Sequence, residues 1–140
     1  PANGNVLHAF DAATGVAPWT YTSPGDKVGY SSPALVGDRV YVGCLGDRGE
    51  VRCVSAADGR EVWTAATGSV IYDSSPAVAD GHVSIGSVDG LLSVLAAGDG
   101  RIVAQYRMPP GHFLASPAAG QGSVYAASHS DVVMGFDLRV

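Results

Sequence analysis

Charged side chains are scarce in this sequence, and the few that are present do not cluster. They make up 15% of the 140 residues, and the net charge is −5. Because phosphate binding needs a basic surface, nucleic acid is not an expected partner. No apolar run approaches the roughly 18 residues of a membrane-spanning helix, so no membrane span is expected. No signal peptide is recognisable at Pro1, where the chain starts in the middle of a repeat.

Cysteine is rare as well, because only Cys44 and Cys53 are present. They fall on the two arms of one expected hairpin. By comparison with a shorter hairpin around Asp89-Gly90, Cys44 should face Val51 and Cys53 should face Val42. The two sulfurs would then be diagonal neighbours, which is poor disulfide geometry. Two buried free thiols are therefore expected, and the pair does not define the redox compartment.

Helical periodicity is absent, whereas turn residues are abundant, with 19 glycines and 8 prolines. This combination is typical of short strands joined by tight turns. The expected strands are 6–10, 17–22, 31–36, 39–44, 50–54, 61–65, 74–79, 82–87, 91–95, 101–106, 115–119, 123–128 and 132–136.

One stretch recurs along the chain. SSPALVGDRVYVG at 31–43 returns as SSPAVADGHVSIG at 74–86 and, less well kept, as ASPAAGQGSVYAA at 115–127. A period of about 40 residues is typical of β-propellers. Strands such as VYVG and VSIG are apolar on both faces, as in sheets buried between neighbours. The predicted fold is all-β, with propeller blades of four antiparallel strands.

About three blades plus a partial one are expected in this chain. With the strands of a blade labelled A to D from the axis outward, the order should be CD, ABCD, ABCD, ABC. The chain, 1–140, is interpreted as one propeller segment with units at about 6–49, 50–90 and 91–131 and an extra strand at 132–140. Propellers close with about four to eight blades. The segment should therefore be part of a longer propeller or a homo-oligomer, with a dimer expected.

The stretch AFDAATGVAPW at 9–19 carries a recognisable motif. It resembles the tryptophan-docking motif A-x-D-x-x-T-G-x-x-x-W of PQQ-like propeller repeats. A second copy keeps Gly59 and Trp63, a third keeps Gly100 with Ala104 in place of Trp, and a fourth begins with Phe136-Asp137. The family includes bacterial quinone-dependent dehydrogenases, the propeller lipoprotein of the outer-membrane assembly machine, and sensor domains of protein kinases.

The resemblance implies a structural, blade-docking role for the motif residues. Trp19 and Trp63 should sit on outer strands and pack against the next blade, because an indole buries a large flat area and its N–H can reach a carbonyl. Asp11 and Asp137 should brace turns. The full set of expected docking residues is Ala9, Asp11, Thr14, Gly15, Trp19, Gly59 and Trp63.

A binding patch is expected on the long loops from strand D to the next strand A. Aromatic and arginine side chains on exposed loops are typical binding anchors. The candidate residues are Lys27, Tyr30, Tyr72, Asp73, Arg107, His112 and Phe113. A second interpretation stays open, in which the Tyr and Phe rings fill gaps between blades.

No catalytic, cofactor or metal site is predicted. The string from Ser128 to Asp131 aligns with a hairpin turn, and neighbours in a tight turn cannot form a triad. The four histidines have no ligand-like spacing.

The sequence therefore favours a non-catalytic scaffold that binds protein or peptide and, by resemblance, lies outside the cytoplasm of a bacterium. The alternative is a fragment of a quinone-dependent dehydrogenase, although Cys44 and Cys53 are not adjacent as in those enzymes and no acidic cluster suits calcium.

Overall fold

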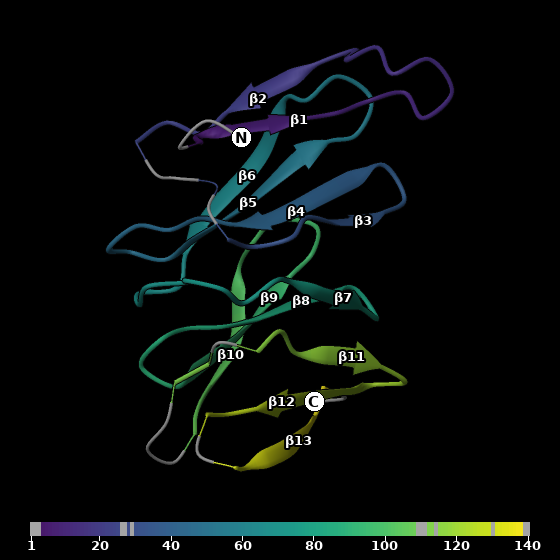
Figure 1. Cartoon of the computed structure of the whole chain (residues 1–140). Helices are drawn as coiled ribbons and strands as arrows, with labels where there is room; N and C mark the ends of the chain where they lie inside the picture. Colours follow the sequence, from purple (N-terminus) through teal and green to yellow (C-terminus); the bar gives the residue numbers. More distant parts are fainter. Residues whose placement is uncertain are drawn as a thin grey trace.

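The computed structural model describes residues 4–25, 28, 30–108, 112–113, 115–129 and 131–138. In this part of the chain, thirteen strands form four antiparallel sheets that are stacked one above the other (Figure 1). The strands are β1 (Val6–His8), β2 (Thr20–Thr22), β3 (Ala34–Val36), β4 (Arg39–Gly43), β5 (Glu50–Ser55), β6 (Glu61–Ala66), β7 (Ala77–Ala79), β8 (His82–Gly86), β9 (Leu91–Ala96), β10 (Ile102–Arg107), β11 (Ala118–Gly120), β12 (Ser123–Ala127) and β13 (Val133–Asp137).

The stacked sheets are propeller blades. The sheet β1-β2 is followed by the four-stranded sheets β3-β4-β5-β6 and β7-β8-β9-β10, and then by β11-β12-β13. This is the predicted order CD, ABCD, ABCD, ABC, so the all-β propeller fold is confirmed. The inner strand β7 contacts both β3 and β11, and the chain termini lie at opposite ends of the stack (Figure 1).

The inner strands are shorter than predicted because the Ser-x-Pro segments lie outside the backbone ladder. Proline has no N–H to donate to a neighbouring strand. Serine side chains hold these segments instead: Ser31 Oγ accepts the N–H of Gly43 at 3.2 Å, and Ser74 Oγ accepts that of Gly86 at 3.0 Å. In both blades, a serine side chain therefore connects the Ser-x-Pro segment to the second strand of the sheet.

The predicted register of the cysteine hairpin is wrong by one residue. Tyr41, not Val42, lies opposite Cys53, and Gly43, not Cys44, lies opposite Val51. The loop 45–49 is two residues longer than the equivalent loop 88–90, and an insertion of two preserves which side chains share a face. Cys44, three residues after Tyr41, therefore lies on the opposite face from Cys53. Both thiols are buried and outside any disulfide, as predicted.

The apolar core lies between the sheets, in two layers. One layer joins the β3–β6 sheet to the β7–β10 sheet and contains Tyr41, Val51, Cys53, Trp63, Ile71, Val83, Ile85 and Leu95. The other joins β7–β10 to β11–β13 and contains Leu92, Val94, Met108, Phe113, Val124, Ala126 and Leu138. The β7–β10 blade is thus apolar on both faces, because it is covered by a neighbour on both sides.

Candidate binding face

Two tyrosines from successive blade-connecting loops form an exposed aromatic pair. Tyr30 precedes β3 and Tyr72 precedes β7, and their rings stack with centroids 5.0 Å apart and planes at 26°. The residues are 65% and 40% exposed. A hydrogen bond with Tyr30, electrostatic repulsion between the two hydroxyl groups, partial burial and the nearby Asp73 carboxylate together raise the pKa of Tyr72. The pair is therefore a flat and solvent-facing platform with two hydroxyls.

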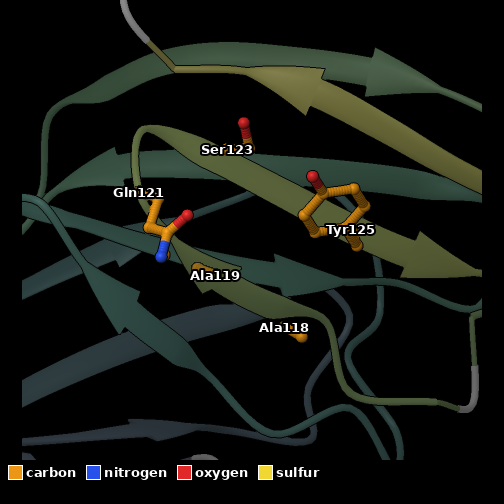
Figure 2. A pocket seen from close by; sticks show the side chains of 6 residues that line it. Ala118, Ala119, Gln121, Ser123 and Tyr125 are labelled. Carbon is orange, nitrogen blue, oxygen red and sulfur yellow. The ribbon is translucent and has the colours of Figure 1, made fainter.

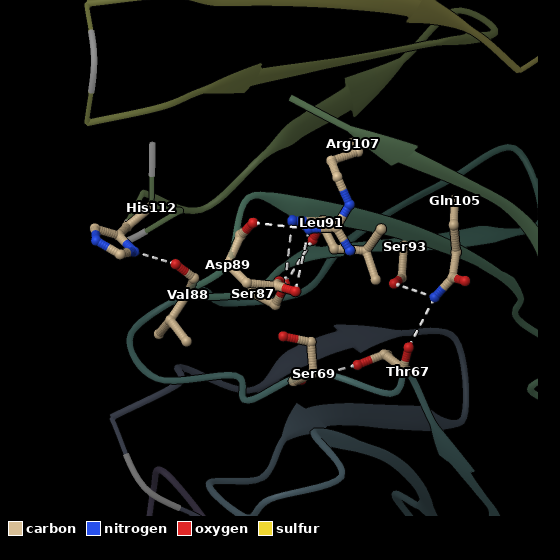
Figure 3. A network of polar contacts seen from close by, with 10 residues as sticks. All are labelled: Thr67, Ser69, Ser87, Val88, Asp89, Leu91, Ser93, Gln105, Arg107 and His112. Atoms are coloured by element: carbon tan, nitrogen blue, oxygen red, sulfur yellow. Dashed lines mark hydrogen bonds and ion pairs between the residues drawn. The ribbon is translucent and has the colours of Figure 1, made fainter. Parts of the chain in front are cut away.

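A polar network borders the next loop along the stack. Arg107, at the end of β10, donates to the Asp89 backbone carbonyl at 3.0 Å and to its carboxylate at 3.2 Å (Figure 3). Although burial raises the pKa of Asp89, hydrogen bonds from Ser69 and Ser87 and the Arg107 charge lower it to about 2. Ser87 Oγ donates to the Asp89 carboxylate at 2.6 Å. This ion pair connects the hairpin turn to the end of β10.

The other predicted loop residues differ from one another in their exposure to solvent. His112 is exposed, and its Nδ1 contacts the Val88 carbonyl (Figure 3). Phe113 is only 1% exposed and belongs to the core, so its ring fills the gap between two blades. Asp73 is half-buried beside Tyr72. Lys27 lies outside the described residues. Of the predicted residues, Tyr30 and Tyr72 therefore contact each other. Arg107 and His112 lie on a different turn, where Arg107 contacts Asp89 and His112 contacts the adjacent Val88.

The two tryptophans contact the next sheet in the same way. Trp19 Nε1 donates to the Ala56 carbonyl at 2.9 Å, and Trp63 Nε1 donates to the Ala97 carbonyl at 3.0 Å. Each indole lies against a glycine: a Cβ at Gly59 would be 2.5 Å from the Trp19 ring, and one at Gly100 would be 2.6 Å from the Trp63 ring. Both glycines have a positive φ of 71° and 74°. The glycine thus supplies the turn conformation and the space for the indole together.

The first motif also closes its own turn. Asp11 Oδ1 accepts the backbone N–H groups of Ala13 at 3.0 Å and Thr14 at 2.8 Å, and the Thr14 hydroxyl at 2.8 Å. These hydrogen bonds lower the pKa of Asp11. Gly15 follows with a positive φ of 71°. Ala9 donates its N–H to the Trp19 carbonyl at 3.2 Å, which joins the two arms of the turn.

A buried arginine network, which sequence reasoning missed, joins the β1-β2 sheet to the β3–β6 sheet. Arg52 is 5% exposed and donates to Tyr21 at 3.1 Å, Glu61 at 2.8 Å and Glu50 at 2.5 Å. Burial and the hydrogen bond to Glu61 raise the pKa of Tyr21 to about 12, so its hydroxyl remains a donor. The signal was available in the sequence, because Arg52 interrupts an apolar strand two residues after Glu50.

The string that begins at Ser128 has the geometry of a hairpin. Ser128 donates its N–H to the Val132 carbonyl, and His129 donates its N–H to the His112 carbonyl. Ser130 lies outside the described residues. In the described part of the chain, no group of three His, Cys, Asp or Glu side chains is placed to hold a metal ion. No helix that could cross a membrane is found there either.

The blades, their Ser-x-Pro inner edges and their recurring Trp–Gly contacts define a PQQ-like β-propeller repeat protein. Residues 2–139 match the family described as "Outer membrane protein assembly factor BamB", and the chain belongs to this family. BamB of Salmonella typhimurium is 29% identical over 123 residues, which cover 87% of this chain and 29% of that protein.

Solved structures show the same architecture. The crystal structure of BamB from Moraxella catarrhalis superposes with a TM-score of 0.80 at 25% identity, covering 97% of this chain and 44% of that one. Quinohemoprotein alcohol dehydrogenase from Comamonas testosteroni gives a TM-score of 0.71 at 21% identity, covering 88% of this chain and 26% of that one. The second likeness shows the fold alone. The chain spans less than half the length of any of these three proteins.

Proposed function

We propose that this chain is a non-catalytic scaffold that binds a protein or peptide segment on the face carrying Tyr30 and Tyr72, outside the cytoplasm. The observation that carries the proposal is the exposed stacked pair itself. Large flat rings that already stack on each other provide a wide contact area for a partner. The relatives' name, outer membrane protein assembly factor, supports a role among protein partners in an extracytoplasmic compartment.

The partner chemistry follows from the surface around the pair. An acidic residue, Asp73, lies beside the two rings, and the chain carries a net charge of −5. A proline or arginine side chain of a partner can stack on a tyrosine ring, and arginine gains further attraction from the acidic surroundings. The expected ligand is therefore an extended peptide segment with arginine or proline at its centre.

A selection experiment tests this proposal. A random 12-residue peptide library displayed on phage is selected against the 140-residue chain, and affinities of enriched peptides are measured by fluorescence anisotropy. The double variant Tyr30→Ser/Tyr72→Ser should weaken binding by about tenfold or more, because stacking anchors of this kind contribute 1 to 2 kcal/mol or more. Leu35→Ser is the matched control, because Leu35 is 66% exposed on β3 and lines a cavity with Leu7 and Trp19 to which neither tyrosine contributes. Equal binding to the double variant would contradict the proposal.

We also propose that the chain assembles through blade–blade packing, with a second copy or with further blades of a longer propeller. The end sheets carry exposed apolar side chains: Phe10 and Val16 are 66% and 63% exposed near β1, and Tyr125 and Val133 are 55% and 72% exposed on β12 and β13. Sheet faces with exposed apolar side chains are usually covered by another blade or another protein chain.

No observation favours the dehydrogenase alternative, because the likeness to the alcohol dehydrogenase shows only the fold.

A further inference from the structure

Tyr72 and Asp73 occupy a short span of loop that is anchored on both sides by buried residues. Ile71, which precedes them, is 1% exposed and belongs to the core between two blades. Ser74, which follows them, is 0% exposed, and its Oγ accepts the N–H of Gly86 at 3.0 Å. The two residues in between are therefore placed at the surface by neighbours that pack inside the molecule.

The residues next to the two tyrosines approach the same glycine. A Cβ at Gly43 would lie 3.0 Å from the Ile71 side chain and 3.2 Å from Ser31 Oγ. Ser31 directly follows Tyr30, and Ile71 directly precedes Tyr72. Because Gly43 has no side chain, the loops before β3 and β7 can approach closely at this point. The two rings stack there with centroids 5.0 Å apart.

Asp73 adds a carboxylate beside the stacked rings. The pKa of Tyr72 is raised mainly by its hydrogen bond with Tyr30, and the negative charge of Asp73 contributes to the same rise. Asp73 is half-buried. In the part of the chain that the structure describes, none of the ion pairs includes Asp73. Partial burial weakens the hydration of a carboxylate, so a cation supplied by a partner would be attracted more strongly there than in open water.

Two other surface sites lack this combination. At the turn between β8 and β9, the Asp89 carboxylate is already paired with Arg107 at 3.2 Å (Figure 3). Figure 2 shows a hollow of about 340 Å³ that is lined by one tyrosine, Tyr125, and by no charged side chain. Its other lining residues are Ala118, Ala119, Gly120, Gln121 and Ser123. Of these three sites, only the one at Tyr72 combines stacked rings with a carboxylate that the described ion pairs leave available.

A planar cation fits such a site better than other side chains do. The guanidinium group of arginine is flat, stacks on aromatic faces, and can donate two parallel hydrogen bonds to one carboxylate. Lysine carries the same charge on a compact, strongly hydrated ammonium group that lacks this plane. Proline can lie on an aromatic ring, but its side chain has neither a charge nor a donor. The carboxylate therefore distinguishes arginine from both alternatives.

We propose that Asp73 makes this site specific for arginine: the guanidinium group of a partner's arginine stacks on the exposed tyrosine rings and donates hydrogen bonds to the Asp73 carboxylate. This role rests on the peptide binding proposed above, and it decides between the two ligands, arginine and proline, that the rings alone would accept. Asp73 is thus a specificity-determining residue, whereas Tyr30 and Tyr72 supply the contact area.

Replacement of one side chain in the ligand tests this role on the unmodified protein. Peptides enriched by the phage selection should share an arginine. In one such peptide, citrulline in place of the arginine keeps the size and the plane but removes the charge, whereas lysine keeps the charge but removes the plane. Each replacement should weaken binding by about tenfold or more, as measured by fluorescence anisotropy.

Replacement of the carboxylate tests the other side of the contact. Asp73→Asn should weaken binding of the arginine peptide by about tenfold and leave binding of the citrulline peptide within about twofold. Asp99→Asn is the matched control. Tyr72 precedes the start of β7, whereas Asp99 follows the end of β9, which runs in the same direction, so the control removes an exposed charge at the opposite end of the blade. It should leave binding of both peptides within about twofold.

The possible results distinguish this role from peptide binding itself. Peptides that need Tyr30 and Tyr72 but share no arginine, or that bind Asp73→Asn as tightly as the unmodified chain, overturn the arginine specificity and leave the binding proposal intact. An equal loss for Asp73→Asn and Asp99→Asn would mean that net charge alone matters, and it overturns the direct contact in the same way. Enrichment of no peptide, or equal binding to Tyr30→Ser/Tyr72→Ser, overturns both proposals.

Discussion

At the scale of single residues, the recurring contact is the one between an indole and a glycine in the next blade. Gly100 combines two constraints, a positive φ of 74° and a Trp63 ring where its Cβ would be. Gly81 has the same φ of 74° with nothing within 4 Å, and Gly98 has neither constraint. These three glycines allow the cost of backbone conformation to be separated from the cost of steric overlap.

Alanine substitutions at these positions should differ in a defined order. Gly98→Ala should leave the free energy of unfolding nearly unchanged, and Gly81→Ala should lower it by about 1 kcal/mol because alanine disfavours positive φ. Gly100→Ala should cost a further 1 to 3 kcal/mol, roughly, because the indole must move. Urea unfolding followed by tryptophan fluorescence measures all three. Equal losses for Gly81→Ala and Gly100→Ala would show that the indole contact does not contribute.

At the scale of elements, a buried ion network joins β2 to β5 and β6. Arg52→Met keeps the volume of the side chain but leaves Glu50 and Glu61 without their cation, at 15% and 37% side-chain exposure. Breaking a buried pair from one side is expected to cost about 2 to 4 kcal/mol. The triple variant Arg52→Met/Glu50→Gln/Glu61→Gln should recover part of that loss. Thermal unfolding followed by circular dichroism gives the comparison.

A surface ion pair in the same blade is the control for that experiment. Arg60 lies 3.5 Å from Asp58, and its side chain is 86% exposed. Arg60→Met should change the free energy of unfolding by no more than about 0.5 kcal/mol, because exposed pairs contribute little. If Arg52→Met proves as mild as Arg60→Met, the arginine network does not hold the two sheets together.

The strands were largely predictable, whereas the contacts between sheets were not. The beginnings and ends of strands are indicated by alternating apolar and polar residues, by turn residues, and by the repeat of Pro33, Pro76 and Pro117. The register around Cys53 depends on how a five-residue loop, 45–49, closes, and periodicity does not encode this. Phe113 and Tyr72 are both loop aromatics in the sequence, yet one is buried and the other exposed. Only the position of the neighbouring blade decides between these outcomes.

At the scale of the whole molecule, the stack is a one-dimensional array in which each sheet contacts only its neighbours. In such arrays, the free energy of unfolding is approximately the sum of a contribution from each unit and a contribution from each interface between units. The β3–β6 and β7–β10 sheets have two interfaces each, whereas β1-β2 and β11–β13 each have one face with exposed apolar residues. The end sheets should therefore open locally more often than the middle ones.

Hydrogen–deuterium exchange measured by mass spectrometry should reveal this gradient. Amides of β4, β5, β8 and β9 should exchange at least about tenfold more slowly than those of β1 and β2, whose strands have three residues each. Uniform protection along the chain would mean that the stack opens as one unit and that the end faces are not its weak points.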